Sequence, residues 1–367
     1  MSENHSMLLK NPKIALMMIV KNEERPLPKL ISSVKHLITE WVIVDTGSTD
    51  NTKQIIQEML GDLPGQIIDR PWVNFGHNRS ELLRNFPDNC DYALLLDADH
   101  IIAVDKETID EQGNVNLNIP EGDCMMLLVE DHNVVYRMPY FVRKRTDMFY
   151  EGATHEYLTA HSPLKRVEYN EIRIRHTAEG GSRGDKFERD LRLLTEELKV
   201  KPSARNYFYL GQTYGALNQA QEAIEAYENC IEKTVWDEEK YLALLRVGRL
   251  LLQLDQKEKA LIKFLLAHET FKQRSEACLE AARILTSFGL RKHALQLLEE
   301  GVERCPQGGI LLIERWVCLW GLETELGSTQ WWLGDKFTAK KTFENVLKRE
   351  DLPEHAINLL KKNLSFC

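Results

Sequence analysis

The second half of the sequence contains an internal repeat, and this repeat restricts the possible folds more than any other feature. Small and aromatic residues recur at matching positions in units that begin at Ala204, Tyr241 and Ser275. Small residues occur where two helices must approach closely, and large residues fill the groove between helical turns. From about Asp185 onward, the apolar residues have the spacing of amphipathic helices. The pattern predicts pairs of helices that stack in series.

The residues at the small and aromatic positions support this repeat. They are Tyr207, Leu210, Gly211, Tyr214, Ala223 and Tyr227 in the first unit, Val247, Gly248, Ala260, Phe264 and Ala267 in the second, and Ala281, Ala282, Ala294, Leu298 and Pro306 in the third. A fourth unit is weaker, because Ala339 and Phe343 fit but the tryptophan-containing stretch before them is longer than the pattern. Residues 354–364 are expected to form a capping helix. The alternative is a helical bundle without repeats.

The first half alternates short apolar runs with amphipathic stretches. Strands are expected at residues 14–20, 41–44, 66–68 and 92–96, and helices at residues 27–38, 51–60 and 77–85. Strands separated by helices favour a parallel, doubly wound α/β sheet. After Asp99 the sequence becomes strand-rich with polar turns, so we expect the sheet to become mixed on one side.

Charge and cysteine usage exclude several classes of protein. The net charge is −9 at pH 7, which disfavours a nucleic-acid binder. The cysteines number 7, are scattered and form no CxxC pair, so we expect neither a zinc site nor a disulfide framework but reduced, mostly buried thiols in a cytosolic protein. No apolar stretch approaches the roughly 18 residues needed for a transmembrane segment, and residues 1–10 do not read as a signal peptide. We therefore expect a cytoplasmic protein, peripheral at the inner membrane face if its acceptor lies there.

The strongest chemical signal is the pair Asp97 and Asp99, which follows three leucines. Carboxylates at alternate positions after a strand can point to the same side, at the carboxyl edge of the sheet where ligands of α/β proteins bind. Hard oxygen donors suit Mg²⁺ or Mn²⁺, which in turn bind a diphosphate. The alternative is that one aspartate only caps a following helix.

Other polar residues follow neighbouring strands. Asp45 ends the predicted strand 41–44 and is placed to accept hydrogen bonds from a base or ribose, although the residues after it can equally be an ordinary strand–turn–helix junction. Asn22 and Glu23 follow the first strand, and Arg79 follows a turn at Gly76. An isolated arginine is more often a surface residue.

Taken together, IVKNEE, VIVDTGSTDNT, FGHNRSELL and LLLDADH resemble, in this order and spacing, the family-2 inverting glycosyltransferases with the GT-A fold, over roughly residues 12–180. The opening motif and the trailing repeats, which resemble tetratricopeptide units, are similar to the branch with lipopolysaccharide-core glucosyltransferases and bacteriocin S-glycosyltransferases. The resemblance implies that Asp45 contacts the nucleoside, uridine in particular. It implies that Asp97 and Asp99 are the D-x-D motif, with Asp99 as direct metal ligand. It also implies that Asn22, Glu23 and Arg79 line the nucleotide pocket.

Two later stretches match the same resemblance. Gly152–Tyr157 is similar to the glycine-then-His-Glu motif of the branch, which implies that Glu156 is the catalytic base, with Asp147 as its rival. His176 ends a short predicted strand and is expected to complete the metal site, with a surface-loop histidine as the alternative. Whether His100 or His155 joins the metal is open. The glycines at 180–181 are expected to form either a mobile lid or a linker.

The predicted protein is thus a metal-dependent inverting glycosyltransferase that uses a nucleotide sugar, with UDP as the expected carrier and a peptide, protein or glycan as acceptor. Its domains are expected at residues 12–183 (GT-A), 184–202 (linking helix) and 203–367 (helical repeats, which can also mediate a homodimer). A sugar nucleotidyltransferase is a rival, but the segment before Lys21 lacks a glycine- and arginine-rich phosphate loop. The second rival is a non-catalytic tetratricopeptide adaptor with a degenerate transferase domain.

Overall fold

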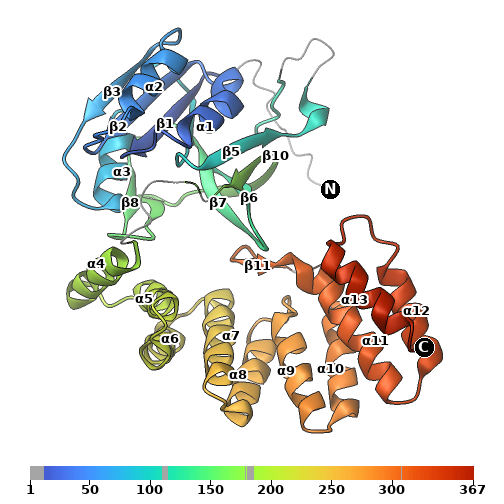
Figure 1. Cartoon of the computed structure of the whole chain (residues 1–367). Helices are drawn as coiled ribbons and strands as arrows, with labels where there is room; N and C mark the ends of the chain where they lie inside the picture. The colour runs from blue at the N-terminus through green and yellow to red at the C-terminus, as the bar shows by residue number, and fades with distance from the viewer. Residues whose placement is uncertain (1–11, 110–114, 178, 180–185, 307) are drawn as a thin grey trace. The chain divides into compact units, whose positions relative to one another are not determined.

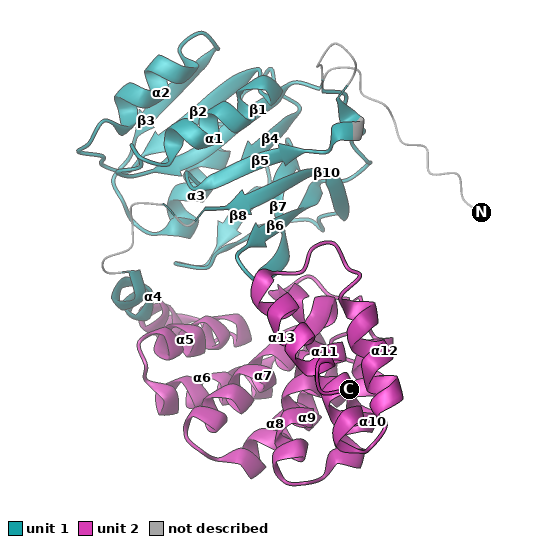
Figure 2. Ribbon diagram, turned by 45° about the vertical axis from the view of Figure 1, so that its right-hand side comes forward, with its two compact units in different colours: residues 1–193 teal, residues 194–367 magenta. Residues whose placement is uncertain are grey.

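The computed structural model describes residues 12–109, 115–177, 179, 186–306 and 308–367. The chain divides into two compact units, with the boundary between Leu193 and Leu194 (Figure 2). This boundary falls inside the helix α4, Lys186–Val200, within the stretch that was expected to form a linking helix. The limits of the domains predicted from the sequence remain predictions.

The first unit is built around one large mixed sheet (Figure 1). Its elements are β1 (Ile14–Val20), α1 (Leu27–Val34), the short helix Lys35–Leu37, β2 (Glu40–Asp45), α2 (Thr52–Leu60), β3 (Gly65–Asp69), α3 (Phe75–Leu83), β4 (Tyr92–Leu95), β5 (His100–Val104), the short helix Lys106–Thr108, β6 (Cys124–Asp131), β7 (Val134–Arg143), β8 (Met148–Glu151), β9 (Tyr157–Ala160) and β10 (Arg166–His176). The predicted helix at 77–85 begins earlier, at Phe75, because the side chain of Asn74 accepts a hydrogen bond from the backbone N–H of His77 and caps it.

The strand order explains why the sheet changes character after Asp99. The order is β3-β2-β1-β4-β7-β6-β10-β5. Strands β1, β2, β3 and β4 run parallel to one another, whereas β7 runs antiparallel to β4 and β5 runs antiparallel to β10. The prediction of a mostly parallel sheet that becomes mixed on one side is confirmed.

Both faces of the sheet are covered. Alternate residues of β1 point to opposite sides, so Leu16 and Met18 join the apolar cluster of α1 and α2, while Ala15 and Met17 pack in the cluster that includes residues of α3, β8 and β9. A strand that is buried on both faces reads as a continuous apolar run, as β1 does. This packing fixes the strand ends that carry the polar residues.

The described residues of the second unit form helices, joined by turns and one short strand. Its helices are α5 (Ala204–Ala216), α6 (Ala220–Lys233), α7 (Asp237–Gln253), α8 (Lys257–Thr270), α9 (Glu276–Ser287), α10 (Arg291–Glu303), α11 (Leu322–Trp332), α12 (Lys336–Val346) and α13 (Glu354–Leu364), and its strand is β11 (Ile313–Glu314). A Cβ on Gly211, Gly248 or Gly327 would lie within 3.0 Å of the aromatic ring of the next helix. Each glycine thus lets two helices approach closely, as the repeat predicts.

The fourth repeat is complete, although its sequence pattern is weak. Gly327 of α11 meets Phe343 of α12 just as Gly248 of α7 meets Phe264 of α8. The extra length before it is an inserted stretch between α10 and α11 that contains β11 and a π-helical turn, Val317–Gly321. The insertion hides the repeat from a search for a fixed period.

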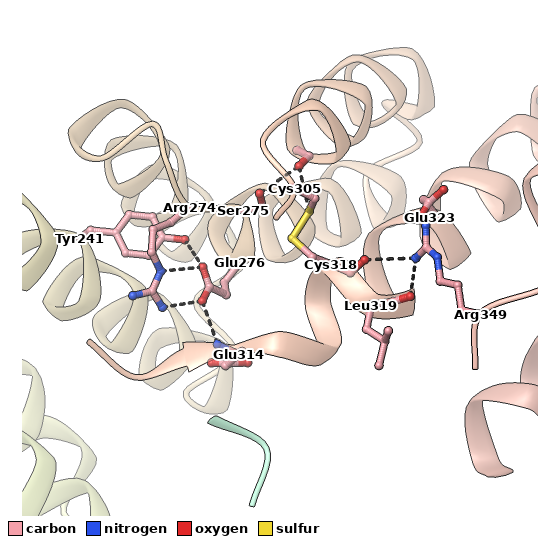
Figure 3. Close-up of a disulfide and its surroundings, with 11 residues drawn as sticks. Tyr241, Arg274, Ser275, Glu276, Cys305, Glu314, Cys318, Leu319, Glu323 and Arg349 are labelled. Atoms are coloured by element: carbon pink, nitrogen blue, oxygen red, sulfur yellow. Dashed lines mark hydrogen bonds and ion pairs between the residues drawn. A yellow bond between two sulfur atoms is a disulfide. The ribbon is translucent and has the colours of Figure 1, made fainter. Parts of the chain in front are cut away.

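The inserted stretch is fastened by a disulfide and by buried charges (Figure 3). Cys305 and Cys318 are bonded, so the expectation that all cysteines are reduced was wrong for this pair. Arg274 is fully buried and pairs with Glu276 and Glu238. It also donates hydrogen bonds to the carbonyl oxygens of Leu311, at 2.5 Å, and Leu312, at 3.1 Å. Spacing alone could not predict a disulfide across this stretch, because no cysteine motif marks it.

Candidate active site

Polar residues meet where the parallel strands β1, β2 and β4 end. Val20, the last residue of β1, pairs with Asp45, the last residue of β2, and Leu95 ends β4 on the other side of β1. Because these strands are parallel, the residues that follow them lie at one edge of the sheet. Asp45 and the pair Asp97 and Asp99 therefore lie at the ends of the two strands that flank β1, at the same edge of the sheet.

Asp45 is buried, and only one of its carboxylate oxygens has a partner. Its Oδ1 accepts hydrogen bonds from the backbone N–H groups of Gly47 at 2.8 Å and Ser48 at 2.9 Å. Gly47 has a φ of 106°, which a glycine adopts readily, so the turn can fold back onto the carboxylate. Within the part of the chain that the structure describes, the buried Oδ2 has no hydrogen-bond partner. A buried acceptor without a partner is costly, and a ligand N–H or O–H would satisfy it.

Asn22 joins two loops. Its side-chain oxygen accepts a hydrogen bond from the backbone N–H of Thr49 at 2.8 Å, and its own N–H donates to Ser48 Oγ at 2.9 Å. Next to it, the backbone N–H of Glu23 donates to Thr52 Oγ1 at 2.7 Å. Asn22 has a φ of 56°, a left-handed conformation that asparagine tolerates better than most residues. These contacts brace the loops after β1 and β2.

Asp99 and His176 come together through the register of β5 and β10. His176 pairs with His100 across these antiparallel strands, which brings its ring beside the preceding Asp99. The His176 Nε2 atom lies 3.2 Å from Asp99 Oδ2, and its Nδ1 atom lies 3.6 Å from Asp131 Oδ1. The hydrogen bond with Asp99 raises the pKa of His176 above its ordinary value. The side chains of Asp99, His100 and His176 form a group whose possible ligand atoms lie within 4.8 Å of one another.

His100 is held in a different way from His176. Its ring is buried, and its Nδ1 atom accepts a hydrogen bond from the backbone N–H of Asp97 at 3.1 Å. Burial lowers the pKa of His100, which favours the neutral ring. The Nδ1 lone pair of His100 is already engaged by the backbone, whereas Asp99 and His176 face each other across 3.2 Å.

Arg79 connects two carboxylates that are far apart in the sequence. Its Nη2 atom donates a hydrogen bond to Asp97 Oδ1, and its Nε atom lies 2.6 Å from Glu156 Oε1. The arginine side chain is only 8% exposed. Burial opposes the charge of Arg79, but the two carboxylates outweigh it and raise its pKa further above the ordinary value. Burial likewise opposes ionisation of Asp97, yet the charge and hydrogen bond of Arg79 keep the pKa of this carboxyl below its usual value.

Glu156 lies in the loop that joins β8 to β9, and α3 supports this loop. A Cβ on Gly76 of α3 would lie 2.2 Å from the carbonyl oxygen of Gly152, so the helix touches the loop directly. The backbone N–H of Phe75 donates to the carbonyl oxygen of Ala153 at 3.1 Å. Thr154 Oγ1 donates to Asp190 Oδ1 at 3.1 Å. The loop is thus held on several sides, and its glutamate is brought to Arg79.

Asp147, the rival base, has its oxygens occupied. Arg145 donates to both of them, at 2.9 and 2.8 Å, and Ser162 Oγ donates to Oδ2 at 2.6 Å. These hydrogen bonds hold the pKa of Asp147 well below its usual range. A general base needs a lone pair that is available to a substrate proton. Glu156 is itself paired with Arg79, so the choice between the two carboxylates remains a prediction.

Some contacts of the site could not be found from the sequence. Asp190 lies in α4, outside every motif, and its buried carboxylate fixes Thr154 and lies 3.8 Å from His155 Nε2. Asn78 also has a structural role, because its side chain accepts from the N–H of Val73 and donates to the carbonyl oxygen of Pro71. The glycines of the expected lid at 180–181 lie outside the described residues.

Comparison with known proteins agrees with this geometry. Residues 15–108 match the model of the family described as glycosyl transferase family 2, and residues 204–232 match that of the tetratricopeptide repeat. The first unit carries a family-2 glycosyltransferase domain, and the second carries tetratricopeptide repeats. The predicted resemblance to family-2 glycosyltransferases and to tetratricopeptide repeats and the predicted fold class are therefore confirmed, whereas the branch within the family remains a prediction.

Individual relatives match only parts of the chain. An uncharacterized glycosyltransferase of Rickettsia felis is 32% identical over 102 residues, which are 27% of this chain and 32% of that protein. The TPR repeat-containing protein Synpcc7942_0270 of Synechococcus elongatus is 28% identical over 149 residues, 39% of this chain and 35% of that protein. The chain thus spans about a third of the length of these curated relatives. The crystal structure of MamA overlaps 46% of this chain and 94% of its own, with 19% identity and a TM-score of 0.37.

Proposed function

We propose that the chain is an inverting glycosyltransferase that transfers a sugar from a UDP-sugar to a peptide, protein or glycan acceptor. One observation carries the proposal. Carboxylates gather at one edge of the sheet of a family-2 domain, where Asp99 meets His176 and Arg79 joins Asp97 to Glu156. Such an edge provides separate groups for a nucleoside, a metal and an acceptor proton.

The nucleoside is assigned to Asp45. Its unpaired, buried Oδ2 is an acceptor that a base N–H or a ribose hydroxyl can satisfy. Asn22 and Glu23 lie in the adjoining loop, and we assign them to the wall of the nucleotide pocket. Their hydrogen bonds to Ser48, Thr49 and Thr52 hold the two loops together and keep Asp45 in place. Since the turn donors already fix Oδ1, the free oxygen is oriented before a ligand binds.

The metal is assigned to Asp99 and His176, with Mn²⁺ or Mg²⁺ as the ion. One carboxylate oxygen and one imidazole nitrogen at 3.2 Å from each other form a donor set that suits Mn²⁺ in particular. When bound, the ion neutralises charge that builds on the departing diphosphate. We assign Asp97, which points at the same edge, to contacts with the diphosphate end of the donor.

The acceptor proton is assigned to Glu156. An inverting transfer needs one carboxylate that removes the proton as the acceptor oxygen or sulfur attacks the anomeric carbon. Arg79 contacts both this carboxylate and Asp97 and so fixes the distance between them. The acceptor side of the site thereby keeps a fixed distance from the donor side.

The repeats suggest how the acceptor is reached. Tetratricopeptide stacks commonly bind peptides or other subunits, and we assign them to acceptor recognition or to a homodimer. The likeness to the lipopolysaccharide-core and bacteriocin branch remains a prediction, as does a location in the cytoplasm. Among the described residues, no helix is long and apolar enough to cross a bilayer.

The proposal is tested by thermal unfolding with UDP, with and without Mn²⁺, and by release of UDP from a panel of UDP-sugars. We expect UDP with Mn²⁺ to raise the Tm more than either alone. Asp99→Ala should remove the Mn²⁺-dependent part of the shift and the turnover. Glu156→Gln should retain the shift and lose the turnover. Asp88→Ala is the control, because that aspartate belongs to the same unit and its side chain is fully exposed. An Asp99→Ala protein that releases UDP as fast as the parent contradicts the metal assignment.

A further inference from the structure

Exposed apolar side chains gather on two neighbouring turns of the repeat unit. Phe288 and Leu290, in the turn between α9 and α10, are 40% and 45% exposed. Trp332 and Phe337, on either side of the turn between α11 and α12, are 62% and 69% exposed. The guanidinium of Arg291 lies 5.2 Å from the centre of the Trp332 ring, so the two turns lie side by side. We call this surface the turn patch: Phe288, Leu290, Arg291, Trp332, Leu333, Lys336, Phe337 and Lys341.

Cations are interleaved with the aromatic rings of the turn patch. Lys336 Nζ lies 5.3 Å from the centre of the Trp331 ring, and Lys341 Nζ lies 4.1 Å from that of Phe337. Segments 288–293 and 331–341 contain the cations Arg291, Lys292, Lys336, Lys340 and Lys341 and the one carboxylate of Asp335, and Lys340 also pairs with Glu344 at 3.9 Å. The whole chain has a net charge of −9. The turn patch is therefore a basic region of an acidic protein.

This combination of charge and shape favours a membrane surface as the occupant. A symmetric dimer through the turn patch would bring the same cations face to face. A helical or extended peptide needs a groove, whereas these side chains project from turns, where Trp332 and Phe337 are more than half exposed. Tryptophan, phenylalanine and leucine flanked by lysine and arginine are typical of protein surfaces that enter the headgroup region of a bilayer. Beside the Trp332 ring, a hollow of about 290 Å³ adds further apolar surface.

We propose that the turn patch docks this protein onto an anionic lipid bilayer. Trp332 and Phe337 enter the boundary between headgroups and acyl chains, and Arg291, Lys336 and Lys341 lie at the level of the lipid phosphates. Docking of this kind requires no helix that crosses the bilayer. The proposal is independent of the transfer reaction, because all of its residues belong to the repeat unit.

The test is co-sedimentation of the full chain with vesicles of phosphatidylcholine alone or mixed with phosphatidylglycerol. We expect binding to the mixed vesicles only, and weaker binding as salt is added. The double variant Trp332→Ser/Phe337→Ser should bind about tenfold more weakly, because the apolar area that enters the bilayer is lost. Lys336→Glu/Lys341→Glu should abolish the preference for phosphatidylglycerol.

A matched control separates the turn patch from exposed apolar surface in general. Ile262 and Leu266 of α8 are 57% and 49% exposed but lie outside the turn patch. The variant Ile262→Ser/Leu266→Ser should bind mixed vesicles as the parent does. The proposal is overturned if the parent ignores mixed vesicles, or if the turn-patch variants bind as tightly as the parent. It is also overturned if light scattering shows a parent dimer that the Trp332→Ser/Phe337→Ser variant dissociates, since the surface is then an interface between copies.

Discussion

Replacing Gly76 with alanine tests whether the loop that carries Glu156 is part of the reaction machinery. The new Cβ would lie 2.2 Å from the carbonyl oxygen of Gly152, and Cβ contacts below 3.0 Å essentially do not occur, so α3 and the loop must separate by about 0.8 Å. Overpacking of this kind costs about 1–3 kcal/mol, and alanine recovers roughly 0.5–1 kcal/mol of helix stability. The fold should therefore survive. A misplacement near 1 Å in a catalytic group can lower turnover about 100-fold.

The effect of Gly76→Ala should appear in turnover and not in nucleotide binding. We expect kcat for UDP release to fall about 100-fold, while the UDP-dependent rise in Tm stays near that of the parent, because Asp45 is held by its own turn. Gly215→Ala is the control, since a Cβ at that helical glycine of α5 meets nothing within 4 Å. Unchanged turnover in Gly76→Ala would refute the role of the loop. An equal loss of UDP binding would show that the loop belongs to the nucleotide pocket.

Other predictions concern the stability of the repeat unit. Arg274→Met should lower the free energy of unfolding by roughly 3–5 kcal/mol in a urea titration, because it leaves Glu238 and Glu276 buried without their cation. Gly248→Ala should cost about 1–3 kcal/mol in the same assay, because its Cβ would lie 2.4 Å from the Phe264 ring. Cys305→Ser should cost about 3 kcal/mol, the value for a closed loop of similar length, and should make stability insensitive to dithiothreitol. Equal unfolding midpoints for parent and variant would contradict each of these.

Much of the fold and part of the site follow from local patterns in the sequence. The strands of the first unit are short apolar runs that end in polar residues, so the positions of Asp45, Asp97 and Asp99 at one edge could be predicted from chain direction alone. His176 could be predicted because a strand ends there. The alternative that an aspartate of the pair caps a helix was wrong, because the strand β5 follows Asp99 directly.

The remaining features depend on contacts between distant segments. The pairing of Arg79 with Asp97 and Glu156 requires the orientation of α3 over the sheet edge, and no local pattern encodes that orientation. The buried Asp190 acts on Thr154 from a helix that reads as a simple amphipathic segment. The disulfide belongs to an insertion that interrupts the repeat, where periodicity carries no information.

The position of Arg79 gives a physical reason why the donor and acceptor parts of the site stay in register. Asp97 follows the end of β4, whereas Glu156 lies on a loop between the short strands β8 and β9. These two segments are far apart in the sequence, so the chain itself does not keep the two carboxylates at a constant separation. Arg79 is buried, donates a hydrogen bond from Nη2 to Asp97 and lies 2.6 Å from Glu156 as an ion pair, so one cation holds both carboxylates at once. The proposed base is therefore positioned relative to the diphosphate end of the donor before either substrate binds, which is the preorganisation that electrostatic catalysis requires.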